Sequence, residues 1–282
     1  MLKLRVITAA VLLVVFSCAI ALGPLAFAGV MAIAFAAVLF EWLRMAGLGP
    51  KPAGLLAVVE MVTQFSLYWS GALPRMQWFL FLINGLVMVA WFVIFIVELM
   101  HRTTGFKVKS GPCMWAAVTF VPAAYLSLLY LFEVGDWVMV LSVFLIVWGA
   151  DISAYFSGRA WGRHKMAPAI SPNKTMEGAI GAYVIVIVFF LLTYWFCIQK
   201  NVFTNLVFDY MGFGWGVVIL AWLVALSIAG DLWESMLKRL AGLKDSSNLL
   251  PGHGGFFDRL DATLPVLPTA CWIVLWIQLT HG

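Results

Sequence analysis

The densest polar sequence of the chain is the window Ser235–Asp261, which reads SMLKRLAGLKDSSNLLPGHGGFFDRLD. Its ionisable side chains are Lys238, Arg239, Lys244, Asp245, His253, Asp258, Arg259 and Asp261, and it is preceded by Asp231 and Glu234. The chain as a whole is 64% hydrophobic and only 11% charged. Charge beside membrane-grade apolar sequence is costly, so the window indicates a functional site. The alternative is a solvated loop that anchors two helices.

The spacing within this window places acids and bases together. If the apolar run that ends near Ala229 continues as a helix, four polar residues fall at i, i+3, i+4 and i+7 on one face, namely Asp231, Glu234, Ser235 and Lys238. The segment Pro251–Gly255 predicts a turn, because its glycines accept positive φ and leave backbone N–H groups accessible. A helix that restarts at Phe256 would project Asp258 and Asp261 together.

Carboxylates without clustered histidine or cysteine favour a hard cation such as Mg²⁺ over zinc. The basic residues Lys238, Arg239, Lys244 and Arg259 would neutralise phosphate groups. Carboxylates that hold a metal, interleaved with cations that hold phosphates, are typical of phosphoryl or nucleotidyl transfer.

A second candidate site is the loop from Ser157 to Met176. Ser171 and Pro172 predict a helix start, with serine as the N-cap and proline in the first helical position. The free N–H groups of that turn, beside Lys174 and Thr175, would form an anion site. The alternative is a basic loop that contacts lipid headgroups. Upstream, Asp151 is expected near the same membrane surface, either in the site or as a polar residue in helix packing.

Two blocks of this sequence resemble a known family. The residues SMLKR, then KD, then HGGFFDRLD, together with the block ISPNKTMEG at Ile170–Gly178, are similar to the signature of the CDP-diacylglycerol synthases, also called phosphatidate cytidylyltransferases. This resemblance covers at least the C-terminal half of the chain. It implies an enzyme of phospholipid biosynthesis that transfers CMP from CTP to phosphatidate, giving CDP-diacylglycerol and pyrophosphate.

The spacing of the residues and this resemblance together indicate roles for individual residues. The expected catalytic residues are Lys238, Arg239, Lys244, Asp245, Asp258 and Arg259. The expected substrate-binding residues are Asp151, Ser171, Lys174, Thr175, Ser235, His253, Gly254 and Gly255, where His253 either contacts substrate or shapes the turn. Mg²⁺, with or without a second cation, is assigned to Asp231, Asp258 and Asp261.

Composition predicts an all-α, polytopic membrane protein, because the mean hydropathy is +1.01. About nine spans are expected: one before Gly23, then 24–41, 53–70, 76–99, 112–132, 137–155, 178–197, 214–229 and 264–279. The third is the least certain, because Glu60 and Gln64 interrupt it. Glu60 is expected either to face the polar cavity or, as we favour, to pair with a neighbouring helix. We divide the chain into N-terminal helices, 1–110, and a C-terminal catalytic region, 111–282.

Basic residues predict the orientation of these spans. With the N-terminus inside, fifteen of the 17 Lys and Arg residues fall on cytoplasmic segments, and only Arg75 and Lys200 fall outside. The active site is therefore expected in a polar cavity that faces the cytoplasm from the cell (inner) membrane, with the C-terminus external. The lipid bilayer is the expected environment, nucleic acid is not an expected partner, and the sequence is compatible with a homodimer.

Two other functions remain as alternatives. A transporter or ion-coupled carrier would also explain acids within the membrane, but it favours charge near the bilayer midplane and matching halves. A CDP-alcohol phosphotransferase needs an Asp-Gly-x-x-Ala-Arg block, which this sequence lacks. The four cysteines are scattered singly and predict neither a disulfide nor a metal site.

Overall fold

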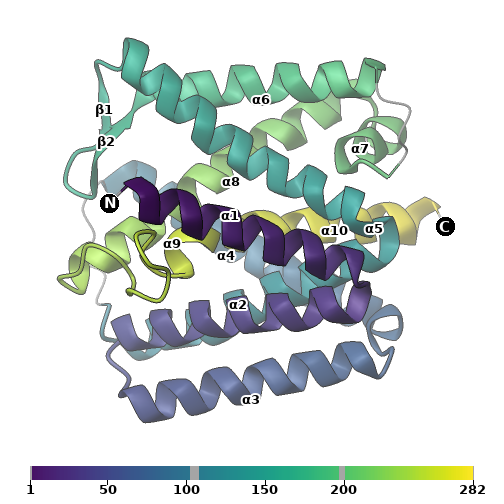
Figure 1. The fold of residues 1–282 in the computed structure, drawn as a ribbon. Coiled ribbons are helices and arrows are strands. Elements are labelled where there is room, and N and C mark those ends of the chain that lie inside the picture. Colours follow the sequence, from purple (N-terminus) through teal and green to yellow (C-terminus); the bar gives the residue numbers. More distant parts are fainter. Residues whose placement is uncertain (1, 102–107, 197–200, 282) are drawn as a thin grey trace.

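The computed structural model describes residues 2–101, 108–196 and 201–281, and in these residues nearly all of the regular structure is helical (Figure 1). The helices are α1 (Leu2–Ala21), α2 (Pro24–Met45), α3 (Pro50–Trp69), the 3₁₀ helix η1 (Leu73–Met76), α4 (Gln77–His101), α5 (Gly111–Trp161), α6 (Met176–Phe196), α7 (Phe203–Met211), α8 (Phe213–Leu240), α9 (Phe257–Leu260) and α10 (Thr263–His281). The strands β1 (Lys165–Ala167) and β2 (Ser171–Thr175) form an antiparallel hairpin between α5 and α6. The protein is an all-α membrane protein with one small hairpin.

Six helices in the described ranges are long and apolar enough to cross a membrane: α2, η1 with most of α4, α5, α6, α8 and α10. Two further apolar helices, α1 and α3, lie outside this set. α3 carries Lys51, Glu60 and Gln64, which lower its hydropathy. The number nine remains a prediction.

α5 contains two of the predicted spans in one run of 51 residues. Its backbone leaves helical geometry at Gly135 and Asp136, where Asp136 has a φ of 59°. This break lies between the predicted spans 112–132 and 137–155. Two helical segments joined by a tight turn therefore account for the length of α5.

α10 lies in the interior of the bundle, against α4, α5 and α8. Its residues from Thr263 to Ala270 are all buried, on every side of the helix. A helix that is apolar all round is stable only where other elements surround it, which explains why no polar stripe interrupts this sequence.

The polar connections gather at one end of the helices. Figure 1 shows the hairpin, α9 and the start of α1 at that end, and the C-terminus at the other. Arg239 at the end of α8 donates to the carbonyl oxygen of Ile170 in the hairpin, at 3.3 Å, so the two polar blocks of the sequence are in contact. Which side of the membrane this end faces remains a prediction.

The predicted division at residue 110 is not tested, but several contacts cross it, since α2 packs against α5 and α9, and α4 against α10. Cys18, Cys113 and Cys271 carry free thiols. Cys197 and Lys200, which entered the sequence predictions, lie outside the described residues.

Candidate active site

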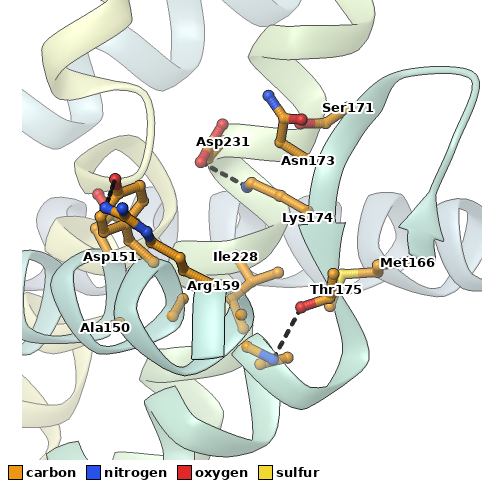
Figure 2. Close-up of a pocket in the computed structure, with 15 residues that line it drawn as sticks. Ala150, Asp151, Arg159, Met166, Ser171, Asn173, Lys174, Thr175, Ile228 and Asp231 are labelled. Carbon is orange, nitrogen blue, oxygen red and sulfur yellow. Dashed lines mark hydrogen bonds and ion pairs between the residues drawn. The ribbon is translucent and has the colours of Figure 1, made fainter. Parts of the chain in front are cut away.

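A pocket of about 490 Å³ lies between α5, the hairpin, α6 and α8. Its polar lining consists of Asp151, Arg159, Ser171, Asn173, Lys174, Thr175 and Asp231. Lys174 reaches from β2 to α8, where its Nζ lies 2.5 Å from Oδ2 of Asp231 (Figure 2). This ion pair joins the first polar block of the sequence to the helix that leads into the second.

The predicted helix start at Ser171–Pro172 is wrong. Residues 171–175 are extended because they pair with β1, with Lys165 opposite Thr175. The helix begins instead at Met176, and the Thr175 hydroxyl accepts a 3.1 Å bond from the Gly178 N–H, as an N-cap does. The anion site expected from free N–H groups at Ser171 is therefore not formed there, and Lys174 is the cationic group that this segment contributes.

α8 continues to Leu240, as predicted, and its polar residues share one face. The Ser235 hydroxyl lies 3.4 Å from Oδ1 of Asp231, and Nζ of Lys238 lies 2.6 Å from Oε2 of Glu234. The Glu234 side chain is 1% exposed. Acidic and basic side chains therefore line this face of α8 from the pocket to the loop that follows the helix.

Asp258 accepts hydrogen bonds from this loop. Its Oδ1 lies 2.6 Å from Nζ of Lys238, and its Oδ2 accepts from the Ser246 N–H at 2.9 Å, the Ser246 hydroxyl at 2.8 Å and the Gly255 N–H at 2.8 Å. Burial opposes ionisation of Asp258, but the bonds from Lys238, Gly255 and Ser246 outweigh it and lower the pKa of this carboxyl to about 2. The Asp258 carboxylate is therefore ionised at neutral pH.

Asp261, one turn later, has the opposite electrostatics. Burial, together with the neighbouring Asp231 and Asp151 carboxylates, raises the pKa of Asp261 well above its usual value. Its backbone packs closely on α8, where a Cβ added to Gly230 would lie 2.7 Å from the Asp261 carbonyl oxygen. Asp258 lies in α9 and Asp261 directly follows this helix, but the two carboxylates have different neighbours.

The carboxylates fit a hard cation in part. In the described part of the chain, no three His, Cys, Asp or Glu residues are already placed as a metal site. Yet Oε1 of Glu234 is buried without a hydrogen-bond partner in that part of the chain, and the carboxylates of Asp231 and Asp151 are close enough to Asp261 to raise its pKa. A cation would relieve this repulsion. Of the two Asp258 oxygens, only Oδ1 could also bind a cation, because it accepts from Lys238 alone and keeps a free lone pair.

Other predicted residues shape the loop. Pro251–Gly255 forms the predicted turn, and Gly254 has a φ of +81°. Arg259 donates to the His253 carbonyl oxygen at 2.8 and 3.1 Å, so this guanidinium braces the turn. The Gly255 N–H is already bonded to Asp258 rather than available to a phosphate. Lys244 and Asp245 are exposed on the loop surface.

Three residues of this region were missed from the sequence. Asn173 and Arg159 line the pocket with Lys174. Glu41, at the end of α2, is 1% exposed and bonds to the loop around Gly255. An acid next to an apolar span is costly, and this cost, which indicated a site at Ser235–Asp261, is also the signal that could have found Glu41. Glu60 was expected to pair with a neighbouring helix, but its partner is Gln64 on its own helix.

Comparison with known proteins places this sequence in a family. Residues 3–277 match the model of the cytidylyltransferase family. The phosphatidate cytidylyltransferase of Haemophilus influenzae is 35% identical over 95% of this chain and 96% of that protein. That of Bacillus subtilis is 30% identical over 94% and 95%, respectively. That of Pseudomonas aeruginosa is 40% identical over 49% of each chain. With nearly its whole length matched, the chain belongs to the cytidylyltransferase family.

Proposed function

We propose that this protein is a phosphatidate cytidylyltransferase, which transfers CMP from CTP to phosphatidate and releases pyrophosphate. The observation that carries the proposal is the Lys174–Asp231 pair, because it joins the first signature block to the helix that leads into the second, at the edge of one pocket. The relatives that match along the whole chain bear the same name. CDP-diacylglycerol is the lipid product.

The reaction joins two phosphate compounds. An oxygen of the phosphatidate phosphate attacks the α-phosphorus of CTP, and the bond from that phosphorus to the oxygen bridging to the β-phosphate breaks, so pyrophosphate leaves. A phosphate monoester has its second pKa near about 6, so the nucleophile is mostly dianionic at neutral pH and needs no strong general base. The main barrier is repulsion between negative charges.

The cations of the site address this repulsion. Lys174 projects into the pocket, and it would exchange its present partner, Asp231, for a substrate phosphate. Lys238 is fixed between Glu234 and Asp258, so its charge is oriented before substrate binds. Arg239 is exposed at the end of α8 and would meet the pyrophosphate side.

Asp231 and Asp261, with Oδ1 of Asp258, are the residues that would hold Mg²⁺. A bound Mg²⁺ would screen the phosphate charges as they come together. The high pKa of Asp261 means that this carboxyl must lose a proton before it can serve as a ligand.

The surroundings of the pocket suit a lipid phosphate. An apolar pocket of about 210 Å³ adjoins it and shares Met166, Ala179 and Ile228 with it. A molecule with a phosphate head and acyl chains would fill both. The cytoplasmic orientation, which the basic residues support, and the inner membrane are both part of the proposal.

The test is a reconstituted reaction in detergent, with neither a sealed membrane nor a gradient. We expect pyrophosphate release, with formation of a CMP-containing lipid, only when CTP, Mg²⁺ and phosphatidate are all present. A contaminating phosphatase that acts on CTP would not depend on phosphatidate, so that dependence is the decisive observation.

The proposal is contradicted if no pyrophosphate forms under these conditions. Transport of an ion or phosphate compound across sealed liposomes, in place of this reaction, would establish the carrier alternative instead.

A further inference from the structure

Glu41 is buried at the end of α2, far along the sequence from both signature blocks. Oε1 accepts from the Ser247 hydroxyl at 2.6 Å and the Phe256 N–H at 3.1 Å. Oε2 lies 2.9 Å from the Ser246 hydroxyl and accepts from the Phe257 N–H at 2.8 Å. Each oxygen therefore meets one hydroxyl and one backbone amide. Three of its four partners belong to the loop between α8 and α9, and the fourth, Phe257, is the first residue of α9.

This loop also donates hydrogen bonds to Asp258, so the carboxylates of Glu41 and Asp258 both bind it. The Ser246 hydroxyl lies between Oε2 of Glu41 and Oδ2 of Asp258, and its backbone N–H bonds to Asp258. Gly255, whose N–H bonds to Asp258, has no room for a side chain: an added Cβ would lie 2.5 Å from both Glu41 oxygens. Asp258 and Glu41 therefore accept from successive backbone amides, Asp258 from Gly255 and Glu41 from Phe256 and Phe257.

We propose that Glu41 is a positioning residue for cytidylyl transfer. It fixes Ser246 and Gly255, and through them it directs Oδ1 of Asp258 toward Lys238 and the site of the transferred phosphates. Glu41 touches neither substrate nor metal in this proposal. The proposal rests on the function proposed above, and it gives the N-terminal helices a part in the reaction.

The substitution Glu41→Gln tests the proposal sharply because it preserves shape. Glutamine has one accepting oxygen and one donating NH₂ group. Both positions face a backbone N–H, from Phe256 or Phe257, so either orientation of the amide sets donor against donor. We expect the loop to shift and kcat to fall about 10²-fold, as for a displacement of about 1 Å at a reacting centre. The Mg²⁺ concentration for half-maximal rate should rise.

Two matched variants isolate the effect. Glu60→Gln neutralises another partly buried glutamate, on α3, whose partner is Gln64 of the same helix, and it should retain nearly wild-type kcat. Ser247→Ala removes one bond to Glu41 without touching Asp258, and it should cause a smaller loss than Glu41→Gln.

Amide hydrogen exchange in detergent provides a measurement that does not depend on activity. In Glu41→Gln the amides of Ser246, Gly255, Phe256 and Phe257 should exchange faster, whereas those of β1 and β2 should not change. Unchanged protection of the loop amides would overturn the proposal, as would wild-type kcat and Mg²⁺ dependence in Glu41→Gln. A loss of activity that matches only the unfolded fraction would overturn it too.

The two proposals fail separately. A wild-type protein that releases no pyrophosphate contradicts the proposed function. An active wild-type protein with an equally active Glu41→Gln variant contradicts only the role of Glu41.

Discussion

The Asp258 carboxylate accepts bonds from Lys238, Ser246 and Gly255, and its low pKa makes a specific prediction about pH. Its folded-state pKa of about 2 lies below the ordinary value of about 3.9. The stability it contributes is therefore present in full above the ordinary value and is lost as the pH falls through about 2.

Asp258→Asn should lower kcat about 10²-fold or more, because Lys238 loses a charged partner and the phosphates lose an oriented cation. Since Asp258 is ionised throughout the range from about pH 6 to about pH 9, the loss should be the same at each pH in this range. A pH–rate profile of both proteins measures this. A variant that recovers wild-type rate at one end of the range would show that Asp258 titrates there and would contradict the assignment.

At this scale, spacing in the sequence predicted a good part of the site. The helical positions of Asp231, Glu234, Ser235 and Lys238 followed from the 3.6-residue period, because one helix contains them all. The spacing did not predict which lysine pairs with each carboxylate. Asp258 takes Lys238 while Asp231 takes Lys174, and these choices depend on how separate elements pack.

At the scale of elements, the contact between α8 and the start of α10 positions the acids. Gly230 leaves space for the backbone at Asp261 and Ala262 and for the ring of Pro265. A side chain at this position would push α8 away and carry Asp231 with it.

Gly230→Ala should therefore destabilise the protein and lower its activity, although alanine is favoured over glycine within helices by about 1 kcal/mol. The matched control is Gly214→Ala in the same helix, where an added Cβ meets nothing within 4 Å. Thermal unfolding in detergent, with activity measured alongside, should show a lower midpoint for Gly230→Ala and an unchanged or higher one for Gly214→Ala. Equal midpoints would mean that α8 and α10 adapt to the added carbon.

The hairpin shows where local sequence signals fail. Ser171 before Pro172 satisfies the rules for a helix start, yet tertiary pairing with β1 keeps residues 171–175 extended. Serine before proline also favours an extended backbone, so both outcomes agree with local preferences. Only the neighbouring strand decides between them.

On the scale of the whole molecule, both polar blocks lie at one end of the bundle (Figure 1), which predicts a pattern of chemical access. In a protein whose native cysteines are replaced by serine, single cysteines at Lys165 and Asn248 should react with membrane-impermeant thiol reagents only from the cytoplasmic side. A cysteine at Asn201 should react only from the opposite side. All three positions are exposed. Labelling of Lys165 and Asn201 from one side would overturn the orientation and the path of α6 across the membrane.

Composition alone predicted a helical membrane protein, since burial in lipid requires helices that satisfy their own backbone groups. The number of spans was harder, because hydropathy does not distinguish one long helix from two that meet at a turn. α5 is such a case: its break at Gly135 and Asp136 depends on two residues in 51.

The Glu41 bonds also constrain the order in which the protein is made. Glu41 and its partner Ser246 are 205 residues apart, so the ribosome must add that length before the partner exists. At about 5–20 residues per second, the interval is roughly 10–40 s. During it, the carboxylate at the end of α2 enters the bilayer surface without its loop. The loop that bonds to Glu41 therefore cannot reach its final structure until synthesis has passed α9.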